Sequence, residues 1–332
     1  MIVLNKEKYT SLELTILCFT LLNSSVSTLL INEFKNLKTI EIIISLLISF
    51  ILGYPLLIMF IKRHFNEIPK SIIIKILLIF LVTIMTIFYT FYFSKLIKDI
   101  LIPNESIYTI YILIIISTML LSNKGIKSIT IASNLFFILN LFIFIIIIFF
   151  NINSVNPINL LPISSNIDNL NFFTIMVFTM SPLFLIYIIP KDNINNKERY
   201  YKSIKKIYII FYIYLITKIL FIISILGNKY FNLVTYPEIT IFKTINIFNL
   251  FERIEEILII NIFTTNIIII SLTICYINTL LKTIIKNEKI IYLTPLINFI
   301  LLINIKELNI NIFLISNIIF IIINLYYKKR KD

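Results

Sequence analysis

The sequence is short of the residues that build most enzyme sites: it has one histidine, two cysteines, three glycines and no tryptophan. The lone His64 gives metal binding or acid–base catalysis little to build on. Cys18 and Cys275 both lie inside apolar runs, so we expect two buried thiols and no disulfide or metal site. A glycine-rich phosphate loop and a nucleophile elbow are both missing. We therefore expect a protein that is not an enzyme and that has no cofactor.

Charged residues are also few. They make up 14% of the chain against 59% hydrophobic residues, and the mean hydropathy is +0.97. The apolar runs are continuous and about as long as the ~20 residues that cross a bilayer as a helix, which favours helices over a membrane barrel. We predict an all-α membrane protein in which residues 1–332 form a single transmembrane domain. The predicted spans are 12–31, 40–61, 73–93, 107–123, 129–150, 172–190, 207–227, 256–277, 290–304 and 311–327.

The net charge of +13 is unevenly placed along the chain. With the N-terminus inside, the inner segments hold 21 of the 30 lysines and arginines, counting Lys75 at the inner end of the third span, and the outer loops hold 8. This bias follows the positive-inside rule and predicts that both termini are cytoplasmic. The tail Lys328-Lys329-Arg330-Lys331 then serves as a topology anchor that attracts anionic lipid. We expect the bilayer, and no nucleic acid, as the partner of these charges.

The first and sixth spans carry polar interruptions at corresponding positions, if the chain consists of two five-span halves. The first reads Asn23-Ser24-Ser25-Val26-Ser27-Thr28, and the second reads Thr179-Met180-Ser181-Pro182. Paired interruptions of this kind indicate a substrate site in a transporter fold, because a broken helix exposes backbone groups that need a polar partner. The alternatives are a helix-packing seam in span 1 and an ordinary proline kink in span 6.

Further polar side chains lie in spans 3 and 8. Thr83, Thr86 and Thr90 share one helical face, and Thr264-Thr265-Asn266 forms a polar patch. Each set either lines a cavity or bridges helices. The candidate ligand-binding residues are Asn23, Ser24, Ser25, Ser27, Thr28, Thr86, Thr179, Met180, Ser181, Pro182 and Thr265.

Asparagine is abundant within the spans, as at Asn134, Asn140, Asn261, Asn298 and Asn317. Such residues ordinarily mark a functional or helix-bridging position. Here the abundance of Ile, Asn and Lys is typical of drift towards AT-rich codons. We therefore interpret each of these asparagines as drift or helix packing.

Lys218 is a charge inside a predicted span. It lies roughly 14–16 Å from the two interfaces at 1.5 Å per residue. Because no Asp or Glu lies deep in any span, we expect no ion-pair partner for it within the chain. An intramembrane charge indicates a functional site. The alternatives are a lysine made neutral by desolvation and a span boundary that lies elsewhere.

Two connections have recognisable character. The segment from about Asn228 to Glu255 has Phe242, Ile245, Phe248 and Phe251 spaced by three, which predicts a short helix lying at the outer interface. Pro237 suits the first turn of such a helix. The charged segment Lys191 to Lys206 is predicted to be a solvated connector.

One stretch of this outer segment resembles a known family. Tyr236-Pro237-Glu238-Ile239 through Phe248-Asn249-Leu250-Phe251-Glu252-Arg253-Ile254-Glu255 resembles the spore germination permeases, the B subunits of endospore germinant receptors, which are related to amino acid–polyamine–organocation permeases. Asn159-Leu160-Leu161-Pro162-Ile163 and Gly125-Ile126-Lys127 are also similar to that family. The resemblance covers essentially the whole chain and implies ten spans in a 5+5 inverted repeat. Glu252, Arg253 and Glu255 then form either a structural ion pair or a contact that couples to a partner subunit.

The resemblance implies a receptor subunit that senses a small nutrient, of the amino acid class, and triggers germination with A and C subunits in the inner membrane of the endospore. Such permeases carry a glycine-rich break in span 1 and an acidic break in span 6, whereas here Ser24, Ser25, Ser27 and Met180-Ser181-Pro182 stand in those places. Glycine lets backbone donors approach a ligand closely. Two alternatives therefore stay open: a secondary amino acid transporter and a ligand-blind scaffold of the receptor complex.

Overall fold

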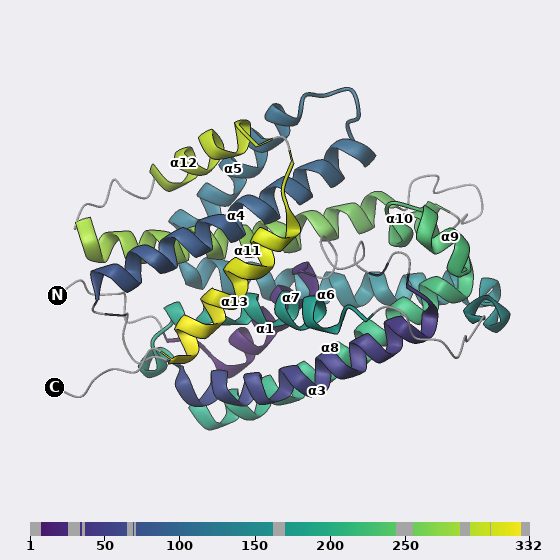
Figure 1. Cartoon of the computed structure of the whole chain (residues 1–332), viewed down its shortest axis with the longest axis horizontal. Coiled ribbons are helices and arrows are strands. Elements are labelled where there is room, and N and C mark those ends of the chain that lie inside the picture. Colours follow the sequence, from purple (N-terminus) through teal and green to yellow (C-terminus); the bar gives the residue numbers. More distant parts are fainter. Residues whose placement is uncertain are drawn as a thin grey trace.

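The computed structural model describes residues 8–25, 34, 37–64, 69, 71–161, 170–243, 255–285, 293–305 and 307–326. These residues fold as a bundle of helices (Figure 1). The helices are α1 (Ser11–Ser25), α3 (Thr39–Arg63), α4 (Ile72–Ile100), α5 (Ile107–Asn123), α6 (Ile126–Asn151), α7 (Phe172–Phe184), α8 (Lys197–Leu226), α9 (Asn228–Leu233), α10 (Pro237–Lys243), α11 (Glu255–Ile285), α12 (Leu293–Ile303) and α13 (Ile310–Tyr326). Short 3-10 helices η2 (Ile152–Ser154), η3 (Pro157–Leu160), η4 (Leu185–Ile188) and η5 (Lys191–Asn193) join some of them.

The bundle has a buried centre and an apolar outside. Helix α1 packs against α6, α7, α8 and α11, and most of its side chains are buried. Figure 1 shows α3 beside α8 along one edge and α5 beside α12 along the opposite edge, with α4 and α11 between them. Side chains on the outside are large and apolar, such as Ile51, Phe80 and Ile138. An apolar exterior around a packed interior is what a bilayer requires of a helical protein.

Five of the helices are long and apolar enough to cross a membrane: Thr39–Arg63, Ile72–Ile100, Ile126–Ser154, Lys197–Leu226 and Leu258–Ile285. Shorter apolar helices occupy Ser11–Ser25, Ile107–Asn123, Phe172–Ile188, Thr294–Ile303 and Ile310–Leu325. A helix thus lies in each of the ten ranges that the sequence analysis proposed as spans. The all-α membrane class is confirmed.

The predicted connector between residues 191 and 206 is exposed at residues 195–199, as expected of a solvated segment, but much of it is helical. Helix α8 begins at Lys197, about ten residues before the predicted start of its span. The side chain of Asn196 accepts a hydrogen bond from the backbone N–H of Arg199 and caps the helix. The helix extends into the charged segment because Lys, Glu and Arg are good helix formers. An apolar run in the sequence predicts only the part of the helix that lies in the bilayer.

Contacts at the two ends of the bundle relate helices that are far apart in sequence. At one end, the backbone N–H of Tyr9 donates to Asn193 (2.9 Å), and Arg63 donates to the carbonyl of Leu325 (2.6 Å). The start of α1 and the end of α13 therefore lie at the same end of the bundle. At the other end, the hydroxyl of Tyr236 donates to Asp99 (2.9 Å), which joins the segment before α10 to the end of α4.

His64 holds the end of α7 against the end of α3. The buried ring lies against Tyr187 of η4 with centroids 5.0 Å apart, and its Nε2–H donates to the carbonyl of Ile189 (2.7 Å). Burial lowers the pKa of His64 to about 4, with Lys191 adding to the effect, although the bond to Ile189 favours the protonated ring. The folded protein therefore keeps this imidazole neutral.

Acidification is expected to destabilise this contact. Between the unfolded pKa of about 6.5 and the folded pKa of about 4, the unfolded chain binds a proton that the folded chain does not. Stability from this group is complete above that window and falls as the pH falls through it, by about 2 kcal/mol at pH 5. Thermal unfolding of wild type and His64→Gln in detergent at pH 7.5 and pH 5 measures it: the variant is expected to lose less stability on acidification. Equal losses in both proteins would contradict the assignment.

Candidate functional site

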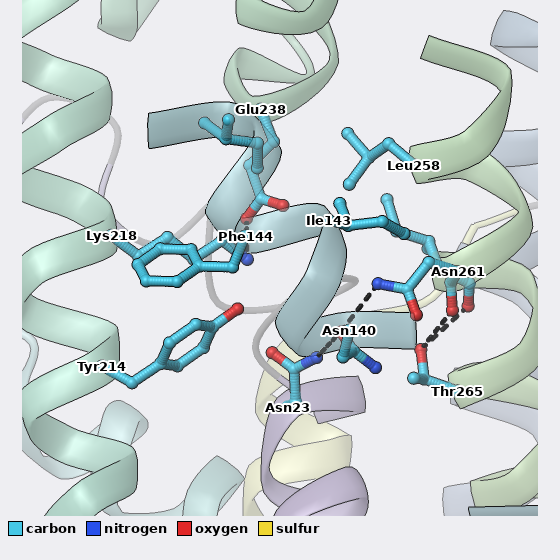
Figure 2. A pocket seen from close by; sticks show the side chains of 12 residues that line it. Asn23, Asn140, Ile143, Phe144, Tyr214, Lys218, Glu238, Leu258, Asn261 and Thr265 are labelled. Carbon is cyan, nitrogen blue, oxygen red and sulfur yellow. Dashed lines mark hydrogen bonds and ion pairs between the residues drawn. The ribbon is translucent and has the colours of Figure 1, made fainter. Parts of the chain in front are cut away.

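A polar cavity lies where α1, α6, α8 and α11 meet beneath α10 (Figure 2). The volume of this cavity is about 20 Å³, which is enough for about one water molecule. The helices bring together an amide cluster, an ion pair, a tyrosine and several apolar side chains. The lining residues are Asn23, Asn140, Ile143, Phe144, Ile147, Tyr214, Lys218, Glu238, Leu258, Asn261, Ile262 and Thr265.

Three asparagines from three helices form the floor of this cavity. The side-chain oxygen of Asn140 accepts hydrogen bonds from the amides of Asn23 (3.0 Å) and Asn261 (2.7 Å). The amide nitrogen of Asn140 in turn donates to the carbonyl of Phe136 in its own helix (3.3 Å). Since that carbonyl only accepts, the bond fixes which end of Asn140 is the oxygen. The cluster therefore ties α1 and α11 to α6.

The same geometry leaves two acceptors open. Asn23 and Asn261 both turn their nitrogens to Asn140, so their oxygens face away from it. Neither oxygen has a hydrogen-bond partner among the residues that the structure describes, and the two side chains are only 4% and 5% exposed. In Figure 2 the oxygen of Asn23 lies towards Tyr214, and that of Asn261 lies towards Thr265. A buried acceptor without a donor is unfavourable by about 1–3 kcal/mol, so these oxygens suit a water or a ligand that donates.

The ion pair lies on the wall opposite the amide cluster. Lys218 Nζ of α8 lies 2.7 Å from Glu238 Oε1 of α10, and the two side chains are 9% and 6% exposed. The ammonium group also lies 5.7 Å from the centre of the Tyr214 ring. The expectation that Lys218 has no ion-pair partner in the chain was wrong. The partner was missed because Glu238 is not in any apolar span and reaches the lysine from the connection after α8.

The connection after α8 folds back onto the bundle. Asn159 of η3 donates to the carbonyl of Ser224 (2.8 Å) and caps the end of α8, and Gly227 (φ 77°) then turns the chain. A positive φ is strained for a residue with a Cβ, and glycine adopts it without strain. Helix α9 and then α10 follow, and α10 packs against α6, α8 and α11. Glu238 thereby reaches Lys218, which is eight residues before the end of α8, or about 12 Å along the helix.

Helix α10 differs from the predicted interface helix in its environment. It begins at Pro237, as the first-turn preference of proline predicts. Pro237, Glu238, Ile239, Ile241 and Phe242 are nevertheless all buried. Residues 244–254, which include most of the predicted helix, lie outside the described part of the chain.

The hydroxyl of Tyr236 secures α10 at its start. It lies 2.9 Å from the carboxylate of Asp99 at the end of α4. Burial raises the pKa of Tyr236, and the neighbouring Asp99 raises it further, so the phenol stays protonated and donates. The tyrosine bond and the Lys218–Glu238 ion pair therefore help to hold α10 over the cavity.

The structure places three of the predicted site residues in this cavity: Asn23, Thr265 and Lys218. The hydroxyl groups of the following residues of spans 1 and 3 bond to the backbone one turn earlier. Ser24 bonds Leu21, Ser25 bonds Leu22, Thr86 bonds Val82 and Thr90 bonds Thr86. Helix α1 stays helical through Ser25, and Ser27 and Thr28 lie outside the described residues.

None of the predicted residues of α7 lines the cavity, and Thr179 and Met180 face α8 and α3 instead. The hydroxyl of Thr179 is 3.1 Å from that of Tyr212, and Met180 lies beside Gly53. A Cβ on Gly53 would meet the hydroxyl of Tyr208, so only glycine leaves room for this tyrosine. The hydroxyl of Ser181 is buried without a hydrogen-bond partner among the described residues. After Pro182 the α-helix continues only to Phe184 and gives way to η4, as expected of a proline interruption.

The motif Glu252, Arg253 and Glu255 is not described at the level of side chains. Glu252 and Arg253 lie outside the described residues, and Glu255 is the first residue of α11. The role of these residues stays a prediction. Nine of the twelve lining residues were not among the predicted site residues, and the polar ones among these nine are Asn140, Tyr214, Glu238 and Asn261. The position of Glu238 beside Pro237, in the stretch that carries the family resemblance, was the signal that would have singled it out.

Comparison with known protein families identifies a family for this chain. A family model described as spore germination protein matches residues 11–312 of the chain. The matched range includes every residue that lines the cavity. No curated protein matches the chain.

Proposed function

The chain belongs to the spore germination protein family, and we propose that it is the membrane-embedded B subunit of an endospore germinant receptor. The observation that carries this proposal is the match of the family model to residues 11–312, nearly the whole chain. The helical bundle with its apolar exterior agrees with an integral membrane protein. The family consists of membrane permeases and receptors and is not a family of enzymes.

The proposal includes a topology. Ten spans form one transmembrane domain over residues 1–332, arranged as a 5+5 inverted repeat with both termini in the cytoplasm. The helices in the ten predicted ranges support it, as does the common end shared by Tyr9 and Leu325. The excess of lysine and arginine in the segments predicted to lie inside supports a cytoplasmic location for that end. The membrane is the inner membrane of the endospore.

The proposed mechanism is a shift between two conformations of the bundle. A small nutrient of the amino acid class binds one conformation better, and companion A and C subunits respond to the change. The ligand site lies at mid-membrane depth, where the predicted residues Asn23, Thr265 and Lys218 meet in one cavity. Such a site needs a conformational change to admit a nutrient, because the cavity holds about one water molecule as it stands.

A second candidate is a scaffold that assembles the receptor without binding a ligand. It is favoured by the hydroxyls of Ser24, Ser25 and Thr86, which are all satisfied by their own helices. A small cavity also suits this role. The two candidates differ in whether substitutions within the cavity alter the nutrient response while leaving the amount of protein unchanged.

Spores in which the gene is deleted test the proposal. We expect them to lose germination in response to at least one nutrient in a panel of amino acids, sugars and salts, and to recover it with the wild-type gene. A tagged chain is expected to copurify with the A and C subunits. Normal germination of the deletion strain with every nutrient would contradict the proposal. Uptake of a labelled amino acid by the purified chain in liposomes would instead support the transporter.

A further inference from the structure

We propose that Lys218 is an anchor for the carboxylate of a small ligand and that Glu238 occupies this anchor in the absence of that ligand. The ligand is a small carboxylate with a hydrogen-bond donor at its other end, such as an α-amino or α-hydroxy acid. Helix α10 is then the cover of the site, and it opens when the ligand replaces Glu238. This inference rests on the proposed function, because it assigns the nutrient site of the receptor.

The first argument concerns the origin of the two charges. Lys218 belongs to a helix of the bundle, whereas Glu238 belongs to the seven-residue α10 that follows a turn and a short helix. A buried lysine is costly without an anion beside it. A ligand carboxylate satisfies that requirement as well as Glu238 does, so exchange between the two keeps the lysine paired. If both charges belonged to long helices packed against each other, neither charge could withdraw to let a ligand take its place.

The second argument is the open acceptor beside the ion pair. The oxygen of Asn23 is buried and has no donor among the described residues. Figure 2 shows it turned towards Tyr214, across the cavity from Lys218. An ammonium or hydroxyl group of the ligand would donate to it. The cavity thus offers a cation and an acceptor on facing walls, which is the complement of a carboxylate and a donor.

The third argument is the chemistry of the remaining walls. Ile143, Phe144, Ile147, Leu258 and Ile262 line the cavity between the polar groups. They would contact the body of the ligand, which is therefore expected to be small and apolar. Such a lining, with few polar groups that fix orientation, is typical of small-molecule sites.

The size of the cavity couples binding to movement. With room for about one water molecule, the cavity does not admit an amino acid while Glu238 is in place. The ligand therefore binds only when Glu238 and α10 withdraw. Their withdrawal changes the contacts of α10 with α6, α8 and α11. Ligand binding therefore changes the conformation of the bundle at the end where α10 lies.

The test uses the full chain in nanodiscs with four probes: glycine, L-alanine, L-valine and L-lactate. Binding is measured by isothermal titration and by the shift of the thermal unfolding midpoint. In Glu238→Gln the amide still accepts a hydrogen bond from Lys218, but the competing negative charge is gone. We expect at least one probe to bind Glu238→Gln about tenfold or more tightly than it binds wild type. A residue with a purely structural role would show no such gain.

Three controls accompany this variant. The carboxamide of each probe keeps its donor and lacks the carboxylate, and it is expected not to bind. The double variant Lys218→Met with Glu238→Met removes both charges and is expected to fold without binding any probe. Asp192→Asn removes the carboxylate of an exposed ion pair with Lys197, and it is expected to leave the affinity unchanged.

The outcomes separate the site from the function. Probes that bind Glu238→Gln no more tightly than wild type, carboxamides that bind as well as carboxylates, or no binding in either protein would each overturn the inference. If deletion spores lose a nutrient response that Glu238→Gln does not shift to lower concentration, the site is wrong and the proposed function stands. If the purified chain binds as expected and deletion spores germinate normally, the proposed function is wrong and the site stands.

Discussion

Lys218→Met is expected to lower the free energy of unfolding by about 3–5 kcal/mol, because it leaves Glu238 buried without its partner. The lysine is 7% exposed and the glutamate 6% exposed, so water does not replace the missing charge. The ion pair is 2.7 Å long and joins α8 to α10. We expect α10 to loosen from the bundle, because the described side chains otherwise hold it by the bond from Tyr236 to Asp99. Thermal and SDS-induced unfolding of the purified chain measure the change.

A double-mutant cycle gives this prediction its control. Glu238→Met is expected to be destabilising in a similar way, and the double variant is expected to recover most of the loss, because two apolar side chains of similar size bury no charge. Lys202→Met is the matched control, since Lys202 is an exposed lysine of the same helix. The control is expected to change stability by less than about 0.5 kcal/mol. A loss in Lys218→Met no larger than in Lys202→Met would mean that the pair does not hold α10.

The helices were predictable because each needs a continuous apolar run. The range 107–123 coincides with α5, and 172–190 covers α7 and η4. The start of α8 was missed because its first turns are charged yet helical. The length of an apolar run predicts only the part of a helix that lies in a bilayer. Helix α10 was predictable in its first residue, Pro237, and not in its burial. Its burial depends on how the segment folds back after Gly227, which no local pattern encodes.

The candidate site was predictable in part, for an equally physical reason. Lys218 stood out because a charge inside an apolar run is rare. Its partner Glu238 did not, because an acid in a connecting segment is ordinary until the fold brings it to the lysine. Asn23 was recognised within a polar cluster of its span. Asn140 and Asn261 look the same in sequence as Asn317 and Asn324, which bond only to their own helices among the described contacts. The two kinds of asparagine differ in whether the packing of the helices brings them to another asparagine. That register between helices cannot be read from a single sequence.

Asn140→Leu tests that register, and its expected effect is the second largest. The side-chain oxygen of Asn140 accepts from both Asn23 and Asn261, so the substitution leaves two buried amide groups without an acceptor. Each such group is unfavourable by about 1–3 kcal/mol, and we expect a loss of about 2–5 kcal/mol in the free energy of unfolding. SDS titration followed by circular dichroism measures it. Helices α1 and α11 are expected to separate from α6, which would be visible as faster hydrogen exchange in α1.

Asn324→Leu is the matched control for this substitution. Asn324 is fully buried in α13, donates to the carbonyl of Phe320 in its own helix, and has a side-chain oxygen without a partner among the described residues. Its removal takes away an unsatisfied acceptor, so the control is expected to be neutral or stabilising. Equal losses in the free energy of unfolding of the two variants would show that the effect comes from replacing a buried amide by leucine, and not from hydrogen bonds between helices. A loss confined to Asn140→Leu would mean that the cavity floor is held by hydrogen bonds between helices. Its open oxygens then have fixed positions, which is the condition for recognising a ligand.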